Sequence, residues 1–369
     1  MLDNNVGIKI AVIGTVGLPA NYGGFETLVE NLVNYLGKQF QFTVYCSFKK
    51  GLERPKKISN AELVYIPLQA NGIQSIPYDI ISMFHAIFKA DVLLVLGVSG
   101  CVCLPLVKMI FGKNIIVHID GLEWKREKWG GMAKWFLKKS EHIAIQYADK
   151  IIADNVAIQE YIAKEYQKES VLIAYGGDHV LPVKKDQNLA WEYPFTYKSY
   201  AFKVCRIEPE NNVHMVLEAF VKNNGMPLVI VGNWANSEYG LVLRKKFGNS
   251  KKIYLLDPIY DQRKLYQLRS NARLYVHGHS AGGTNPSLVE AMFLGLPIIS
   301  FDINYNRETT KNRAIYFSSA ETLVKVLSSL ESFNLSVLGA KMKAVALNYY
   351  TWDIVTKKYA KLFGSPNAL

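Results

Sequence analysis

Short apolar segments alternate with helix-like segments along most of this 369-residue chain, and this alternation restricts the possible folds more than any other feature. Segments 9–14 (KIAVIG) and 91–97 (DVLLVLG) are apolar after their first residue, as expected of strands buried on both faces of a sheet. Because neighbouring parallel strands need a crossover between them, usually a helix, the pattern predicts an α/β fold with parallel sheets. Further strands of the first half are expected at 41–47, 61–68, 114–121, 150–155 and 170–177.

The alternation pauses at residues 178–199, a polar, proline-containing stretch without periodicity that we interpret as a linker. It then resumes, with strands expected at 200–207, 227–233, 252–258, 273–279 and 297–302 and helices at 212–223, 262–272 and 285–295. A chain of this length fits two domains better than one core. We therefore predict a first Rossmann-like domain over residues 1–185, a second over 186–345 and a terminal helical segment over 346–369.

The balance of charge favours anionic partners. Lys and Arg number 43 against 31 Asp and Glu, which gives a formal net charge of +12 and suits nucleotides, phosphates, nucleic acid or acidic lipid. The basic residues are scattered and form no nucleic-acid-binding motif, so we expect no nucleic-acid partner. The spacing of the four cysteines predicts reduced thiols in a cytosolic protein: Cys46, Cys101, Cys103 and Cys205.

Segment 91–112 is the strongest candidate for a membrane span. Gly, Ser, Pro and Lys interrupt its apolar residues, whereas a span needs about 20 predominantly apolar residues. We therefore expect a buried strand, a loop and a short helix in this segment.

The motif GHSAGGTNPSLVEAM, residues 278–292, joins an expected strand to an expected helix. Asn285 is a plausible N-cap and Pro286 suits the first helical turn. A helix N-terminus favours an anion, and Gly282 and Gly283 allow a phosphate to approach the backbone closely. Glu290, about one turn into the helix, is placed to accept hydrogen bonds from a ribose diol. The alternative is a tight turn followed by a helix with a solvent-facing glutamate.

The loop GTVGLPANYGGFET, residues 14–27, follows the first strand and precedes a helix. Gly23 and Gly24 lie just before that helix, where small residues permit close approach of a phosphate at the carboxyl edge of a sheet. The spacing is not GxGxxG, so it does not predict a dinucleotide site. A plain connecting loop remains the alternative.

Segment 118–139 (HIDGLEWKREKWGGMAKWFLKK) places His118 and Asp120 at the end of an expected strand. Ligands of α/β sheets bind at that edge, although a lone histidine is more often structural. Aromatic and basic residues mix over the rest of the segment, which indicates either a lipid interface or a solvated helix packed through its tryptophans. These residues are Trp124, Trp129 and Trp135 beside Lys125, Arg126, Lys128, Lys134, Lys138 and Lys139.

The stretch CRIEPENN, residues 205–212, closes the first strand of the second half. A guanidinium at a strand end can bind a diphosphate through two hydrogen bonds, which makes Arg206 a candidate ligand. The alternative is a surface arginine paired with Glu208 or Glu210.

These four segments together resemble those of retaining glycosyltransferases of family 4, and more narrowly the bacterial capsule and exopolysaccharide rhamnosyltransferases. The resemblance spans nearly the whole chain, and residues 349–363 are similar to the last helix of that family. It implies the GT-B fold, in which two Rossmann-like domains face each other across a cleft. The first domain would bind the acceptor, the second would bind the nucleotide-sugar donor, and the terminal helix would cross back onto the first.

Residue by residue, the resemblance implies that Gly23 and Gly24 face the donor phosphates and that His118 contacts the transferred sugar. Arg206 matches the arginine that binds the diphosphate, and Glu290 matches the glutamate that binds the ribose. The helix-start residues would bind the diphosphate mainly through their amides: Gly283, Thr284, Asn285, Pro286, Ser287 and Leu288.

Two positions depart from the family pattern. The first glutamate of the E-x7-E motif falls on Gly282, and the lysine that partners the arginine falls on Asn211, which we still expect near the donor. From these departures we expect a donor other than UDP-glucose, and for this branch L-rhamnose carried on dTDP.

The family also implies retention without a metal or other cofactor. Attack from the same face would let the leaving phosphate oxygen take the acceptor proton, with Asp120 as an alternative base or nucleophile. The acceptor would be a lipid-linked saccharide, met by a cytoplasmic enzyme bound peripherally to the inner face of the cell membrane. Alternatives are a UDP- or GDP-linked donor, a nucleotide-sugar 2-epimerase of the same architecture, or a sensor that binds the donor without turnover. We expect Glu290→Ala to weaken donor binding and to leave the fold intact.

Overall fold

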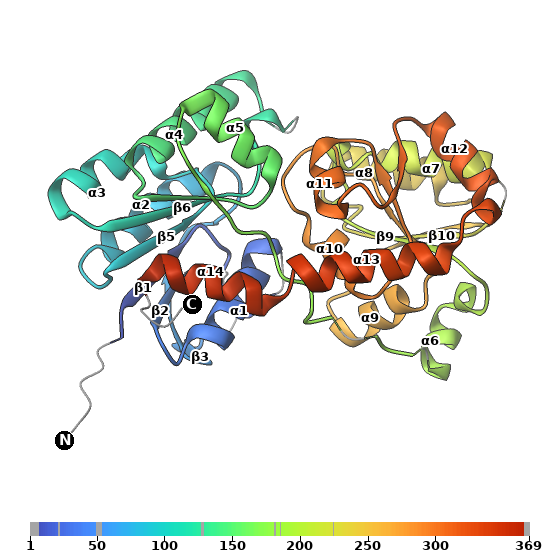
Figure 1. Ribbon diagram of the computed structural model, residues 1–369, viewed down its shortest axis with the longest axis horizontal. Helices are drawn as coiled ribbons and strands as arrows, with labels where there is room; N and C mark the ends of the chain where they lie inside the picture. The colour runs from blue at the N-terminus through green and yellow to red at the C-terminus, as the bar shows by residue number, and fades with distance from the viewer. Residues whose placement is uncertain are drawn as a thin grey trace. The chain divides into compact units, whose positions relative to one another are not determined.

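The computed structural model describes residues 7–20, 23–48, 54–126, 129–180, 182–184, 186–223 and 225–364. The chain divides into two compact units. Figure 1 shows the chain coloured by residue number from blue to red. Unit 1 comprises Met1–Tyr175 together with Trp352–Leu369, and unit 2 comprises Gly176–Thr351. Each unit is a parallel-sheet α/β domain, as the alternation of apolar and helical segments predicts.

Unit 1 is built on an eight-stranded sheet with the order β3-β4-β2-β1-β5-β6-β7-β8. All neighbours pair in parallel except β3, which is antiparallel to β4. The strands are β1 (Lys9–Ile13), β2 (Gln41–Ser47), β3 (Lys57–Ile58), β4 (Ala61–Ile66), β5 (Val92–Leu96), β6 (Asn114–Ile119), β7 (Lys150–Ala153) and β8 (Val171–Leu172).

The helices of unit 1 are α1 (Gly24–Leu36), α2 (Ser75–Ala86), α3 (Leu104–Phe111), α4 (Gly131–Tyr147), α5 (Val156–Tyr166) and α14 (Trp352–Phe363). Leu28 and Leu32 of α1 face the sheet and are fully buried in one apolar cluster with Ile10 and Val12 of β1. Trp352 and the apolar face of α14 join the same cluster, and α14 lies alongside α1 (Figure 1). The last helix of the chain is therefore part of the core of unit 1.

Unit 2 is built on a six-stranded, fully parallel sheet with the order β11-β10-β9-β12-β13-β14. Its strands are β9 (Ala201–Val204), β10 (Leu228–Val231), β11 (Ile253–Leu256), β12 (Leu274–His277), β13 (Ile298–Phe301) and β14 (Ile315–Phe317). Its helices are α6 (Gln187–Glu192), α7 (Val213–Lys222), α8 (Glu238–Phe247), α9 (Gln262–Ser270), α10 (Pro286–Phe293), α11 (Asn304–Thr310), α12 (Ala320–Ser328) and α13 (Leu335–Tyr349). Helix α12 packs beside α7, and α13 packs beside α10 (Figure 1).

The division of the chain differs in detail from the expected boundaries of 185/186 and 345/346. Unit 2 begins at Gly176, and the segment that returns to unit 1 begins at Trp352. Residues 178–199 are more regular than a linker, because they contain α6 and a 3-10 helix at Pro194–Tyr197. The carboxylate of Asp186 caps α6 by accepting a hydrogen bond from Leu189 N at 2.8 Å. A short capped helix of this kind leaves no long apolar periodicity in the sequence.

Segment 91–112 forms β5, a 3-10 helix and α3, as expected. Across the described residues, no helix combines the length and the apolar character that crossing a bilayer requires. The four cysteines are all free thiols.

Candidate functional site

The expected donor loop of unit 2 lies between β12 and α10. Asn285 caps α10 with its side chain, which accepts hydrogen bonds from Ser287 N at 3.0 Å and Ser287 Oγ at 2.7 Å. Gly282 has a φ of +117°, a conformation that favours glycine, and no atom lies within 4 Å of where a Cβ would be. The residues expected to bind the donor thus cluster at one helix N-terminus: Gly283, Thr284, Asn285, Pro286, Ser287 and Leu288.

Only part of the predicted helix-start set has backbone N–H groups available to a ligand. Pro286 has no N–H, the N–H of Ser287 is held by the Asn285 side chain, and that of Leu288 bonds to Asn285 O at 3.1 Å. Among the described residues, the backbone N–H groups of Gly283 and Asn285 have no protein acceptor. An anion at this end of α10 would therefore bind the loop amides without displacing the cap.

Glu290 faces protein partners inside unit 2. Its Oε2 accepts a hydrogen bond from Arg269 Nη1, and its Oε1 lies 3.2 Å from His179 Nε2. The Arg269 side chain is only 2% exposed, so this ion pair is largely removed from solvent. Burial raises the pKa of Glu290, but Arg269 and His179 outweigh burial and lower it to about 2.

This ion pair changes the expected consequence of losing Glu290. A substitution that removes the carboxylate leaves the guanidinium of Arg269 buried without its partner, which is strongly destabilising. We therefore replace the expectation of an intact fold for Glu290→Ala with one of a weakened unit 2. The sequence separates Arg269 and His179 from the motif at 278–292, and no signal in it predicts that they converge on Glu290.

Two further basic side chains lie near the carboxyl ends of β9 and β12, and the sequence analysis missed both. Lys203 and His277 are fully buried, and within the described part of the chain neither Lys203 Nζ nor either ring nitrogen of His277 has a hydrogen-bond partner. Burial lowers the pKa of Lys203, and burial together with the charge of Lys203 lowers that of His277 well below its usual range. The ring of His277 stacks on that of His279 with a centroid separation of 4.4 Å.

The loop after β9 is fixed by Asn211 and Asn212. The Asn211 amide donates to Arg206 O at 2.6 Å, and that of Asn212 donates to Gly278 O at 2.8 Å. Asn211 is 2% exposed, so its side chain closes the loop and does not face solvent. Arg206 is half-exposed and pairs with Glu208 at 3.7 Å, as the alternative interpretation expects. Within the described residues the pair is not hydrogen-bonded and its arginine is exposed, so it holds the guanidinium only weakly.

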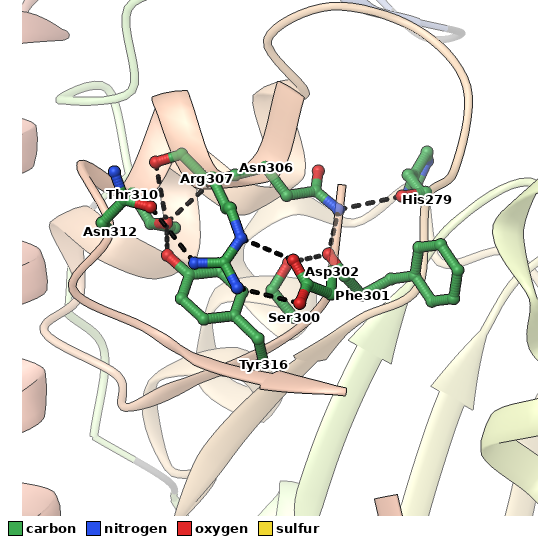
Figure 2. A network of polar contacts seen from close by, with 9 residues as sticks. All are labelled: His279, Ser300, Phe301, Asp302, Asn306, Arg307, Thr310, Asn312 and Tyr316. Atoms are coloured by element: carbon green, nitrogen blue, oxygen red, sulfur yellow. Dashed lines mark hydrogen bonds and ion pairs between the residues drawn. The ribbon is translucent and has the colours of Figure 1, made fainter. Parts of the chain in front are cut away.

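A polar network at the end of β13 holds the start of the donor loop (Figure 2). Asn306 of α11 donates to His279 O and Phe301 O, both at 2.9 Å. Arg307 binds both carboxylate oxygens of Asp302, at 2.5 and 2.8 Å, and lies over a tyrosine ring 4.1 Å away. The hydrogen bonds from Arg307 hold the pKa of Asp302 below its usual range. The Asn306 bonds therefore tie the backbone of the donor loop at His279 to the end of β13.

In unit 1, His118 is the last but one residue of β6 and is fully buried. Its Nδ1 lies 2.8 Å from the hydroxyl of Tyr359 in α14, whereas its Nε2 has no hydrogen-bond partner within the described residues. Burial lowers the pKa of His118 to about 3, so the ring is neutral at physiological pH. Asp120 follows β6, and after burial its charge is the largest of those that raise the pKa of Tyr175.

The glycine-rich loop after β1 folds back onto the first turn of α1. The buried carboxylate of Glu26 accepts hydrogen bonds from Thr15 Oγ1 at 2.8 Å and Val16 N at 2.7 Å. Gly23 is the N-cap of α1 and Gly24 its first residue. A carboxylate in the first turn disfavours an anion, so this loop is a weaker phosphate site than its glycines alone predict.

Segment 118–139 divides into a packed part and an exposed part. The indole N–H of Trp124 donates to Glu141 at 3.2 Å, and that of Trp129 donates to Glu123 at 3.0 Å. Lys138 lies over the Trp124 ring at 4.7 Å, while Trp135 is 63% exposed. The packed interpretation therefore holds for Trp124 and Trp129, whereas Trp135 is exposed and the lipid interface stays a prediction. Lys128 lies outside the described residues.

Comparison with known families gives one match in each half of the chain. Residues 188–337 match the family described as glycosyl transferases group 1. Residues 8–178 match a family described as a domain of unknown function, DUF1972. No curated protein matches the chain in sequence.

Solved structures show the fold of the chain. Sucrose-phosphate synthase from Thermosynechococcus elongatus superposes with a TM-score of 0.81 at 14% identity, covering 96% of this chain and 98% of that chain. Anabaena Alr3699/HepE in complex with UDP-glucose gives a TM-score of 0.75 at 14% identity, over 97% and 100% of the two chains. The S. aureus MnaA–UDP co-structure gives 0.66 at 13% identity, over 98% of each. The chain has the GT-B fold, and the domain match supports a glycosyltransferase.

Proposed function

We propose that this protein is a retaining glycosyltransferase that binds the diphosphate of a nucleotide sugar at the N-terminus of α10. The observation that carries the proposal is the arrangement there: two unpartnered loop amides, at Gly283 and Asn285, in a domain that matches group 1 glycosyltransferases. The half-exposed guanidinium of Arg206 would supply positive charge. Complexes of HepE with UDP-glucose and of MnaA with UDP support a nucleotide-linked donor.

The chemistry of the proposed reaction follows from charge. Breaking the anomeric C–O bond develops positive character on the sugar and negative charge on the departing diphosphate. Oriented N–H groups and a guanidinium stabilise that charge with little reorganisation, and in this proposal no metal is needed. His118 would contact the transferred sugar, and the leaving phosphate oxygen would take the acceptor proton as the new bond forms on the same face.

We propose L-rhamnose carried on dTDP as the donor. Gly282 supports this choice, because the site has no carboxylate where the family pattern places one, and the φ of +117° disfavours any side chain there. A missing carboxylate changes which sugar hydroxyls can be bound. Thermal-shift screening of dTDP-rhamnose, UDP-glucose and GDP-mannose tests the donor, and we expect a selective shift with the first.

We propose that the acceptor is a lipid-linked saccharide reached at the cytoplasmic face of the cell membrane. Large apolar side chains of unit 1 support a lipid contact, because Met109 of α3 is 80% exposed and Met132 and Trp135 of α4 are 86% and 63% exposed. Helices α3 and α4 pack together, so these side chains belong to neighbouring elements. The expected interface thus includes α3 as well as segment 118–139.

Two assays test the activity and the membrane contact. Transfer of radiolabelled rhamnose to a lipid-extractable saccharide, undiminished by EDTA, is the expected result. Conversion of the donor alone into an epimer, without transfer, would instead indicate a 2-epimerase.

The protein should float with vesicles of anionic lipid, and Met109→Ser with Trp135→Ser should reduce flotation without reducing donor binding. Flotation that is unchanged in this double variant would contradict the proposed membrane surface.

A further inference from the structure

The hydrogen bond between His118 and Tyr359 joins residues that are 241 positions apart in the chain. Both side chains are fully buried, and the Tyr359 hydroxyl lies 2.8 Å from His118 Nδ1. The rings of Phe25 and Tyr175 flank the imidazole, with centroid separations of 5.4 and 5.9 Å. The orientation of the imidazole is therefore fixed on several sides, and α14 supplies the contact to Nδ1.

The direction of this hydrogen bond decides which nitrogen of His118 carries the proton. Within the described residues, the Tyr359 hydroxyl has no other hydrogen-bond partner. If Nδ1–H donated to the hydroxyl, the phenolic hydrogen would be buried without an acceptor, at a cost of about 1–3 kcal/mol. If the hydroxyl donates to Nδ1, its hydrogen is satisfied. The second arrangement is favoured, and in a neutral ring it leaves the proton on Nε2.

We propose that Tyr359 is a positioning residue that holds His118 as the neutral Nε2–H tautomer, so that His118 donates a hydrogen bond to an oxygen of the transferred sugar. The assignment of that oxygen rests on the proposed function, whereas the tautomer does not. In this state Nδ1 accepts from Tyr359 and Nε2 carries a hydrogen, so neither nitrogen has a lone pair to abstract a proton. His118 therefore does not act as a general base.

The position of Nε2 supports a ligand contact. It is a fully buried polar atom without a partner in the described residues, at the end of a sheet strand where α/β proteins bind ligands. A sugar hydroxyl oxygen accepts a hydrogen bond from N–H and would satisfy this atom. The other titratable groups placed nearby are Asp120, Asp154 and Glu26, whose negative charges, after burial, raise the pKa of Tyr175 beside the imidazole.

Nitrogen-15 NMR of histidine-labelled protein tests the tautomer directly. The His118 signal is assigned by its loss in His118→Gln. We expect a single neutral ring with the proton on Nε2 in the wild type between pH 5 and 8. A proton on Nδ1 in the wild type, or a titration within that range, would overturn the proposal without bearing on whether the protein transfers sugar.

Tyr359→Phe removes the hydroxyl and keeps the ring. We expect the variant to lose the pure Nε2–H signature and kcat to fall about fivefold to tenfold, the loss expected for one hydrogen bond, with KM for the donor unchanged. Tyr350→Phe is a matched control, because this buried tyrosine donates to Thr309 O at 3.0 Å in unit 2. An unchanged His118 spectrum in Tyr359→Phe would refute the positioning role. If that variant fails to fold, the wild-type spectrum alone still decides the tautomer.

Discussion

Replacing Glu290 by Gln should destabilise unit 2, because it leaves Arg269 buried without its counter-charge. The change is nearly isosteric, so packing is preserved and the lost interaction is electrostatic. The pKa of Glu290 falls from its usual 4.5 to about 2, which corresponds to about 3 kcal/mol of stability at neutral pH. Removing one partner of a buried ion pair lowers the free energy of unfolding by about 3–5 kcal/mol, in agreement with that figure.

The pH dependence has a defined sign. The carboxyl has a lower pKa in the folded state than in the unfolded state, so its contribution is complete above pH 4.5 and is lost as the pH falls toward 2. The difference in the free energy of unfolding between the wild type and Glu290→Gln should therefore shrink below pH 4.5. Urea unfolding followed by hydrogen exchange of peptides from β12 and α10 measures the stability of unit 2 separately from unit 1.

Two further variants make this prediction specific. Glu308→Gln is a control in the same unit, because Glu308 pairs with Lys311 at 3.4 Å near the surface and should cost less than about 1 kcal/mol. Arg269→Met combined with Glu290→Gln removes the unpaired buried charge of Arg269. The double variant should therefore recover most of the free energy of unfolding that Glu290→Gln loses. A loss in Glu290→Gln no larger than that in Glu308→Gln would refute the reasoning. Donor affinity in the stable double variant then tests the ribose role, and wild-type affinity there would remove it.

Variants at Lys203, His118 and Asp302 test the expected donor site of unit 2 and the histidine of unit 1. Lys203→Met should raise the thermal stability of unit 2, because an unpartnered buried lysine is replaced by an apolar side chain. It should also lower donor affinity measured by calorimetry, because the positive charge near the expected diphosphate is lost. Unchanged stability would show that the Lys203 ammonium is solvated. His118→Ala should retain nucleotide binding and lose turnover, and undiminished transfer would exclude a catalytic role. Asp302→Asn should loosen the donor loop and raise KM for the donor, since Arg307 loses its carboxylate; an unchanged KM would exclude that coupling.

The fold was predictable because it depends on the order of apolar and helical segments along the chain. Strands such as β1 and β5 are apolar over nearly their whole length, and that composition is typical of parallel strands covered on both faces. The short helix α6 was not predictable in this way, because it depends on a local cap at Asp186. The return of Trp352 to unit 1 followed only from the family resemblance, since periodicity does not say which domain a terminal helix joins.

The candidate site was predictable only as a set of segments. The motif at 278–292 correctly placed a capped helix after a glycine-rich loop, with Asn285 as the cap. The state of each side chain depends on partners that are distant in sequence: Arg269 and His179 for Glu290, and Tyr359 for His118. Such pairs carry no spacing signal, because tertiary packing alone brings them together.

Unpartnered buried nitrogen atoms lie at or near the carboxyl ends of strands in both units, and they lead to a final prediction. Lys203 Nζ and the His277 ring nitrogens lie in unit 2, and His118 Nε2 lies in unit 1. Each such atom costs about 1–3 kcal/mol until a ligand supplies an acceptor or donor. A nucleoside diphosphate alone should therefore slow hydrogen exchange in β9 and β12, whereas the intact nucleotide sugar should also slow it in β6. Equal protection of β6 by both ligands would show that the sugar is not what His118 contacts.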